Sequence, residues 1–212
     1  HKRFGLYRVH EGPTVEKLHT FREYLRTLGL HLEGGEEPTT ADFARLIEQA
    51  KGRTDFEIIQ TMCLRSLQQA IYSPDNSGHF GLSYTLYTHF TSPIRRYPDL
   101  LTHRVIKSIL KSQRYVPDLE PEEGDEMLTR NQREHSQWER LGIMLSARER
   151  RADEASYDVQ AWLKCYFMKD HVGEVYSGKI TGVAPFGIFI TLDALYVEGM
   201  VHVSELGSDY FV

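Results

Sequence analysis

Residues 87–104 read YTHFTSPIRRYPDLLTHR. The run places two adjacent arginines, Arg95 and Arg96, in a Ser-Pro frame, with aromatic residues, histidines and a further arginine close by. Core packing does not require this density of guanidinium groups, whereas a polyanion such as RNA does. Guanidinium groups bind phosphate oxygens bidentately, and aromatic rings stack on bases. The run therefore predicts a local surface for RNA.

The same run predicts the start of a helix. Pro98 suits the first helical turn, because a backbone N–H would have no partner at that position. The residues that follow divide at helical spacing into an inward apolar set and an outward basic set: Leu101, Val105 and Ile109 inward, and Arg104, Lys107 and Lys111 outward.

Three more amphipathic helices are predicted upstream. Thr14 can cap the first helix, and Gly29 stands at its end. A second helix begins at Thr40. Thr54 and Glu57 fit a capping box, in which the hydroxyl and the carboxylate satisfy reciprocal backbone donors. The helix after this box carries an apolar stripe that we expect to be buried: Ile59, Cys63, Leu67 and Ala70.

Downstream, residues 127–168 have the pattern of one or two further helices, and the character of the chain then changes. Residues 172–206 alternate apolar and polar side chains between glycine turns, which is typical of short antiparallel strands. We therefore expect two domains, residues 1–170 and residues 171–212, and an α+β fold class.

Composition sets limits on function. Hydrophobic content of 41% and charged content of 26% are ordinary for a soluble globular protein. The net charge of -5 means that any surface for nucleic acid must be local. Cys63 and Cys165 both fall in apolar helical patterns, and we expect them to be reduced core residues of a cytoplasmic protein. Neither a membrane span nor a signal peptide is visible. The chain has no initiator Met, so we expect it to be a piece of a longer protein.

Three segments carry a resemblance to a known family. Residues 79–104, HFGLSYTLYTHFTSPIRRYPDLLTHR, resemble the signature of the RNase II/RNase R exoribonuclease family, in the C-terminal half of its catalytic RNB domain. Residues 149–168 resemble RNase R more than RNase II. Residues 172–206 resemble the first part of an S1 domain, an OB-type barrel. The resemblance implies a mainly helical part of an RNB domain over residues 1–170 and an incomplete S1 barrel over residues 171–212.

The resemblance also implies an activity. Members of this family are processive 3′→5′ exoribonucleases that hydrolyse single-stranded RNA to 5′-nucleoside monophosphates with Mg²⁺. Such cations need carboxylate oxygens held close together, and the family supplies them from an aspartate cluster in the N-terminal half of the RNB domain. This sequence contains no Asp-x-Asp or Asp-Asp pair. We therefore expect Mg²⁺ ligands outside the chain and negligible hydrolysis by the chain alone.

The resemblance assigns roles to single residues. Arg95 corresponds to the family arginine that contacts the scissile end of RNA, and we expect it to stabilise the transition-state phosphate. The alternative is that Arg95 has a structural role and forms a salt bridge to an acidic helix. Arg96 either contacts RNA or pairs with an acid such as Asp99. The run contains eight other predicted RNA-binding residues. Each could instead have a structural role, such as capping a turn, packing a ring in the core or forming hydrogen bonds within the protein as a structural histidine does. These residues are Tyr87, His89, Phe90, Thr91, Ser92, Tyr97, His103 and Arg104.

In the S1-like segment, Phe186 and Phe189 lie where S1 domains expose rings for RNA, and His202 lies on the next matched strand. Lys179 is a candidate phosphate contact. Strict alternation places the two phenylalanines on opposite faces unless a bulge intervenes, so one of them could belong to the core.

Two features of residues 148–158 limit the resemblance. Ser156 and Tyr157 stand where RNase II has a Glu-Arg pair, so we assign no catalytic carboxylate there. The neighbouring arginines could line an RNA channel, but nearby acids make a solvated helix with local ion pairs the simpler expectation. The residues concerned are Arg148, Arg150 and Arg151, with Glu149, Asp153 and Glu154 as partners.

Two other classes of function remain open. One is an RNA-binding scaffold whose RNB domain has lost hydrolysis, and aspartates encoded upstream of His1 would argue against it. The other is a helical domain joined to an OB barrel that recognises something other than RNA. Binding without a dependence on salt would favour this last class.

Overall fold

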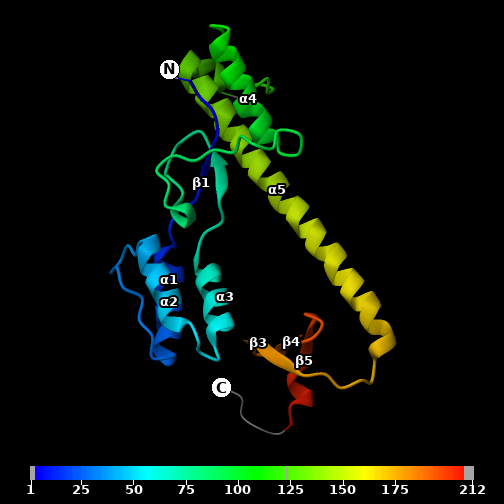
Figure 1. The fold of residues 1–212 in the computed structure, drawn as a ribbon. Helices are drawn as coiled ribbons and strands as arrows, with labels where there is room; N and C mark the ends of the chain where they lie inside the picture. The colour runs from blue at the N-terminus through cyan, green and yellow to red at the C-terminus, as the bar shows by residue number, and fades with distance from the viewer. Residues whose placement is uncertain (1–2, 123, 208–212) are drawn as a thin grey trace. The chain divides into compact units, whose positions relative to one another are not determined.

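The computed structural model describes residues 3–122 and 124–207. The chain forms two compact units, unit 1 (His1–Arg151) and unit 2 (Ala152–Val212). Unit 1 contains two short strands and four helices, with the first part of a fifth (Figure 1): β1 (Tyr7–Val9), α1 (Val15–Thr27), α2 (Thr40–Ala50), α3 (Phe56–Ser66), β2 (Ile71–Ser73), α4 (Tyr97–Leu110) and the start of α5 (Arg130–Met168).

Helices α1, α2 and α3 pack around one apolar cluster, in which Leu25, Ala50 and Ile59 are fully buried. The predicted ends of α1 are confirmed. The hydroxyl of Thr14 accepts a hydrogen bond from the backbone N–H of Lys17 at 3.3 Å, as an N-cap does.

The capping box lies in another helix than the one predicted. At α2, the hydroxyl of Thr39 donates to Oδ2 of Asp42 at 2.6 Å, and the backbone N–H of Thr39 donates to the same oxygen at 2.7 Å. These two hydrogen bonds lower the pKa of the Asp42 carboxyl. The box predicted at Thr54 and Glu57 is wrong, because α3 begins at Phe56 and its N-cap, Asp55, makes no side-chain cap. The carboxylate of Asp55 instead binds the guanidinium of Arg53 through two contacts of 2.8 Å.

The predicted apolar stripe of α3 is confirmed only in part. Ile59 and Cys63 are buried, and burial raises the pKa of the Cys63 thiol to about 11. The helix ends at Ser66, so Leu67 and Ala70 fall outside it. The other cysteine, Cys165, is exposed, and its predicted place in the core is wrong.

A second apolar cluster joins the remaining elements of unit 1. Strands β1 and β2 pair antiparallel, and Tyr72 of β2 packs with Leu101 of α4 and Trp138 of α5. The inward position predicted for Leu101 is confirmed, since it is 1% exposed. Ser146 of α5 accepts a hydrogen bond from the backbone N–H of Tyr72 at 2.9 Å, which ties the helix to the strand.

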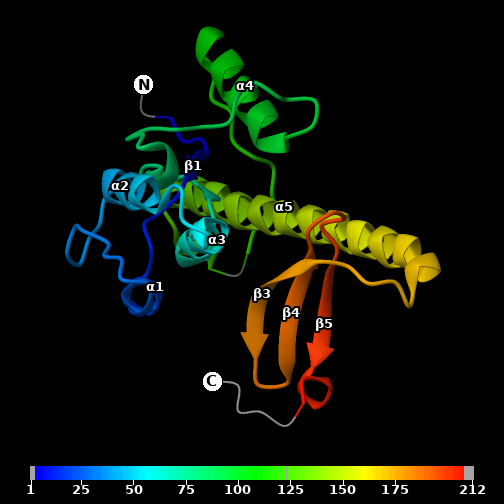
Figure 2. The same ribbon diagram turned by 60° about the horizontal axis from the view of Figure 1, so that its bottom comes forward.

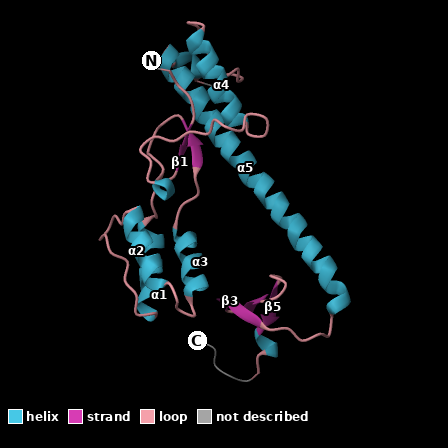
Figure 3. Ribbon diagram, in the orientation of Figure 1, coloured by secondary structure: helices cyan, strands magenta, loops and turns pink. Residues whose placement is uncertain are grey.

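In unit 2, α5 continues to Met168 and a three-stranded antiparallel sheet follows (Figure 2). Its strands are β3 (Gly178–Ala184), β4 (Gly187–Leu192) and β5 (Glu198–His202), in the order β3-β4-β5. Helices with two small sheets confirm the α+β class (Figure 3). The domain boundary expected at residue 170 stays a prediction, since the compact units divide within α5.

None of the helices in residues 3–122 and 124–207 combines the length and the apolar character that crossing a bilayer requires.

Close packing of α5 on β2 makes Gly142 a sharp test of the fold. A Cβ at this position would lie 2.5 Å from the carbonyl oxygen of Tyr72, which is backbone and cannot turn aside. We expect Gly142→Ala to lower the free energy of unfolding by about 1–3 kcal/mol, although alanine ordinarily favours a helix over glycine. Urea unfolding measures the change. Gly5→Ala is the control, since a Cβ there meets nothing within 4 Å; stabilisation by Gly142→Ala would contradict the packing.

Candidate nucleic-acid interface

A buried carboxylate organises the loop that precedes α4. Asp99, in the first turn of the helix, is 0% exposed. Its Oδ1 accepts hydrogen bonds from the backbone N–H of Ser92 at 2.7 Å and from Nη2 of Arg96 at 2.9 Å. The carbonyl of Ser92 in turn accepts from the backbone N–H groups of Arg95 and Arg96 at 3.3 and 3.0 Å. These bonds fix both ends of the loop to α4.

The two adjacent arginines have different surroundings. Arg96 pairs with Asp99, and its side chain is 25% exposed. Of the two roles predicted for Arg96, the structure therefore contains the ion pair with Asp99. Arg95 is exposed, and its guanidinium makes one contact, to the hydroxyl of Ser92 at 3.5 Å. In the described part of the chain Arg95 has no acidic partner. Its guanidinium is therefore available to a phosphate, while that of Arg96 braces the loop.

Beneath the loop lies a network of polar groups from distant parts of the sequence. The hydroxyl of Tyr72 lies 2.9 Å from Nδ1 of His89 and donates to Glu149 at 3.2 Å. Glu149 forms an ion pair with Arg8 at 2.6 Å, and the Arg8 guanidinium lies 4.6 Å from the centre of the Tyr72 ring. The pairing expected between Glu149 and its neighbours on α5 is therefore wrong: the acid bonds to β1.

Burial decides the protonation of this network. It raises the pKa of Tyr72 to about 12, so the phenol keeps its proton. Burial also lowers the pKa of His89, and the charges of Arg96 and Arg8 lower it further. Sequence analysis missed Arg8, Tyr72 and Glu149 as supports of the site, because no local pattern links three positions so far apart along the chain.

Aromatic rings surround the loop. The ring of Tyr87 lies 5.2 Å from that of His79 and 5.7 Å from that of His89. Phe90 stacks on His103, with 4.3 Å between ring centres and 6° between planes, and the His103 ring nitrogen lies 2.9 Å from the carbonyl of Phe90. Phe90 is 43% exposed, so part of its ring is accessible from solvent.

The remaining predicted residues of the run lie at the surface. Thr91 is exposed, and Tyr97 is 45% exposed. Arg104 donates from Nη1 to the hydroxyl of Tyr97 at 3.1 Å and to that of Tyr115 at 3.3 Å. The structure thus brings the run together on one loop and the helix that follows, while RNA contact by each residue stays a prediction.

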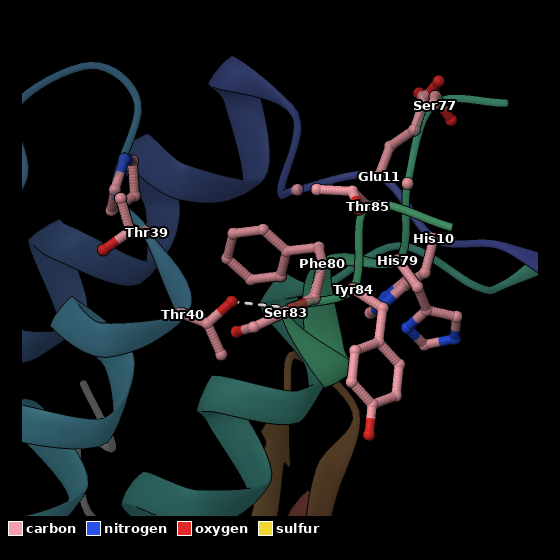
Figure 4. A pocket seen from close by; sticks show the side chains of 13 residues that line it. His10, Glu11, Thr39, Thr40, Ser77, His79, Phe80, Ser83, Tyr84 and Thr85 are labelled. Atoms are coloured by element: carbon pink, nitrogen blue, oxygen red, sulfur yellow. Dashed lines mark hydrogen bonds between the residues drawn. The ribbon is translucent and has the colours of Figure 1, made fainter. Parts of the chain in front are cut away.

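A cavity of about 510 Å³ lies between the N-terminus of α2 and residues 77–85 (Figure 4). Hydroxyls, histidines and rings line it, and Thr40 donates to the carbonyl of Phe80 at 2.7 Å across one wall. None of the predicted RNA-binding residues lines this cavity. Sequence analysis missed it because separate segments form its walls, although Tyr87 makes ring contacts with two lining residues, His79 and Tyr84.

In unit 2, Phe186 lies in the turn before β4, and its ring contacts that of Phe189 edge to face at 6.1 Å. The opposite faces expected for these two rings are therefore wrong, because the alternation of a strand does not apply to a turn residue. His202 pairs in register with Gly187, next to Phe186, and its Nδ1 lies 2.9 Å from the hydroxyl of Ser204. Lys179 is exposed on β3.

Within residues 3–122 and 124–207, no three His, Cys, Asp or Glu side chains come together in a way that could hold a metal ion. The described residues therefore do not fit the magnesium site that the family resemblance implies.

Comparison with known proteins bears on the whole chain. The RNB domain family matches residues 1–112, and the S1 RNA binding domain family matches residues 169–212. Ribonuclease R of Escherichia coli (strain K12) is 47% identical over an alignment of 213 positions, which covers 98% of this chain and 25% of that protein. The chain thus spans about a quarter of the length of the curated relatives that it matches.

Solved structures agree with these matches. Mycoplasma genitalium RNase R in complex with ribose methylated single-stranded RNA superposes with a TM-score of 0.83 at 26% identity, covering 100% of this chain and 32% of that one. Yeast Ssd1, described as a pseudonuclease, gives a TM-score of 0.61 at 20% identity, covering 94% of this chain and 24% of that one, which shows the fold alone.

The bond between Arg96 and the buried Asp99 should be coupled more strongly than a surface ion pair. We expect a double-mutant cycle of Arg96→Met and Asp99→Asn, measured by urea unfolding, to give a coupling of about 1–3 kcal/mol. The control is the cycle of Arg26→Met and Glu23→Gln on the exposed pair of α1, where about 0.2–0.5 kcal/mol is expected. Equal couplings in the two cycles would show that the buried pair does not organise the loop.

The pH dependence of stability should report the burial of His89. Because the fold lowers the pKa of this histidine below 6.5, its full contribution is present above that pH and is lost as the pH falls through the folded-state pKa. Between about pH 7.5 and about pH 5.5, His89→Gln should lose less thermal stability than the wild type. The exposed His31 provides the control, since His31→Gln should follow the wild type. Identical pH profiles for all three proteins would refute the prediction.

Proposed function

The chain belongs to the RNB family, and on that premise we propose that the full-length protein is a 3′→5′ exoribonuclease that degrades single-stranded RNA. The observation that carries the proposal is the exposed Arg95, which has no acidic partner in the described residues and stands on a loop fixed by the buried Asp99. The similarity to ribonuclease R of Escherichia coli and to an RNase R in complex with single-stranded RNA supports it.

In this proposal the guanidinium of Arg95 binds the scissile phosphate. A guanidinium offers donors in a planar fork that matches phosphate oxygens, and such donors act most strongly where charge develops in the transition state. The bonds of Asp99 to Ser92 and Arg96 hold the loop before RNA arrives. Binding therefore requires little ordering of the loop, and Pro93 reduces that requirement further by limiting its backbone.

Further contacts with RNA are assigned to the neighbouring residues. Partly exposed rings, Phe90 and Tyr97, stack on bases. The hydroxyls of Thr91 and Ser92, together with His103 and Arg104, bind the sugar-phosphate backbone. In unit 2, the backbones of Phe186 and His202 are neighbours at one end of the sheet, and the two side chains contribute to an RNA surface of the S1 type.

Hydrolysis also needs a divalent cation, which we propose to be Mg²⁺ held by carboxylates outside this chain. Such an ion would supply polarisation of the phosphate and activation of water. The described residues offer no site for it, so we infer that the chain alone does not hydrolyse RNA. Processive release of 5′-nucleoside monophosphates belongs to the same proposal. A cytoplasmic location fits it too, since Cys63 and Cys165 are unpaired thiols.

A second candidate is a scaffold that binds RNA without cleaving it. The likeness of fold to yeast Ssd1, a pseudonuclease, leaves this class open, because a fold alone does not determine an activity. The uncompensated charge of Arg95 favours the enzyme, since binding alone does not require a donor aimed at a transition state.

Arg95→Lys tests the proposal in the full-length protein. We expect turnover of 5′-labelled single-stranded RNA with Mg²⁺ to fall roughly 100-fold, because lysine cannot form the fork, while RNA affinity changes little. Arg26→Lys, an exposed arginine on α1, serves as the control and should keep full turnover.

Three outcomes would count against this function. Unchanged turnover in Arg95→Lys would reject the role of that arginine. RNA left intact by the wild type with Mg²⁺ would favour the scaffold over the enzyme. Metal-dependent degradation by the 212-residue chain alone would show that its active site is complete after all.

A further inference from the structure

A second cavity, of about 320 Å³, lies at the C-terminal end of α4, and four cationic residues line it. Arg104, Lys107 and Lys111 recur along α4 at spacings of three and four residues, so they share one face of the helix. Arg114 and Tyr115 follow the helix and also line the cavity. This set, which we call the basic cavity, lies outside the loop that carries Arg95.

Most of the charge in the basic cavity is uncompensated. Arg114 is neutralised by Glu134, which accepts from its guanidinium at 2.6 Å and is 3% exposed. The side chains of Lys107 and Lys111 are exposed and make no hydrogen bond or ion pair with any described residue. Arg104 is held by the hydroxyls of Tyr97 and Tyr115, and no carboxylate of the described residues pairs with it. Three positive charges therefore gather here, in a chain of net charge -5.

Helix stability alone does not account for this grouping. A single lysine near a helix C-terminus interacts favourably with the helix dipole. Two lysines at a spacing of four residues repel each other, which offsets part of that gain. The hydroxyls of Tyr97 and Tyr115, and no carboxylate of the described residues, hold the Arg104 guanidinium in the lining of the cavity. An anion in the cavity would relieve the repulsion and meet a fork that is already positioned.

We propose that the basic cavity binds a backbone phosphate of a single-stranded polynucleotide, as a subsite separate from the Arg95 loop. This inference rests on the proposed function for its ligand. Tyr97 links the two places, since it belongs to the 87–104 run and also contacts Arg104. At 1.5 Å per residue, Lys107 lies about 15 Å along the helix axis from Tyr97. The cavity therefore holds a phosphate several nucleotides away from the one at Arg95.

The test uses Lys107→Gln/Lys111→Gln in the full-length protein, with Arg26→Gln/Lys51→Gln as a control of equal charge change at exposed surface pairs. Affinity for 5′-labelled single-stranded RNA is measured with EDTA present and over a series of salt concentrations. We expect the cavity variant to bind about 10-fold more weakly. Its slope of log affinity against log salt should be shallower by about 0.7–1.4, which corresponds to one or two lost phosphate contacts. The control should keep the wild-type slope.

A second probe, inorganic polyphosphate, separates this subsite from the exonuclease proposal, because it carries phosphates without bases or a cleavable RNA backbone. The wild type could bind polyphosphate more tightly than the cavity variant does and yet fail to hydrolyse RNA. That result would support phosphate binding by the basic cavity and reject the proposed function. The full-length protein could be an active exonuclease whose cavity variant keeps the wild-type salt slope and polyphosphate affinity. That result would overturn the phosphate subsite and leave the proposed function in place. A lowered thermal midpoint as the only effect would overturn it likewise, since the lysines would then serve the helix dipole.

Discussion

The candidate site depends on one buried charge. A carboxylate withdrawn from water is costly unless it is paired and hydrogen-bonded, and Asp99 meets that condition through one oxygen, Oδ1, which binds Ser92 and Arg96. Any conformation of the loop that breaks these bonds leaves a charge stranded inside the protein. Breaking the bonds of the buried Asp99 would cost free energy, and this cost holds the loop in one conformation. The loop therefore exposes Arg95 to solvent without needing a ligand to order it.

Two identical side chains acquire different tasks from this constraint. The charge of Arg96 is neutralised by the buried Asp99, whereas the charge of Arg95 remains uncompensated among the described residues. The same contrast recurs at the end of α4, where Glu134 neutralises Arg114 but phenols hold Arg104. In an acidic chain, the distribution of unpaired cations says more about where a polyanion could bind than net charge does.

Predictions that depended on adjacent residues were confirmed, and predictions failed where contacts with distant residues competed. Thr14 caps α1 as predicted, because capping involves only adjacent residues. The box expected at Thr54 did not form, since α3 starts later and Arg53 takes the carboxylate of Asp55. Glu149 has suitable partners on its own helix, yet it bonds to Arg8 of β1, which the packing of β1 and β2 on α5 brings within reach.

The sequence by itself determined the α+β class, the family, the start of α4 and the loop that carries the paired arginines, because each depends on residue types at short, fixed spacings. Only the tertiary structure decided which arginine faces solvent, which acid supports the loop and which cations gather at the end of α4. Those outcomes depend on burial, and burial of one group is set by side chains that lie far from it in sequence. The physical reason is that the whole packed unit excludes water from a buried group. A sequence motif contains only neighbouring residues, so it does not show which distant side chains cover them.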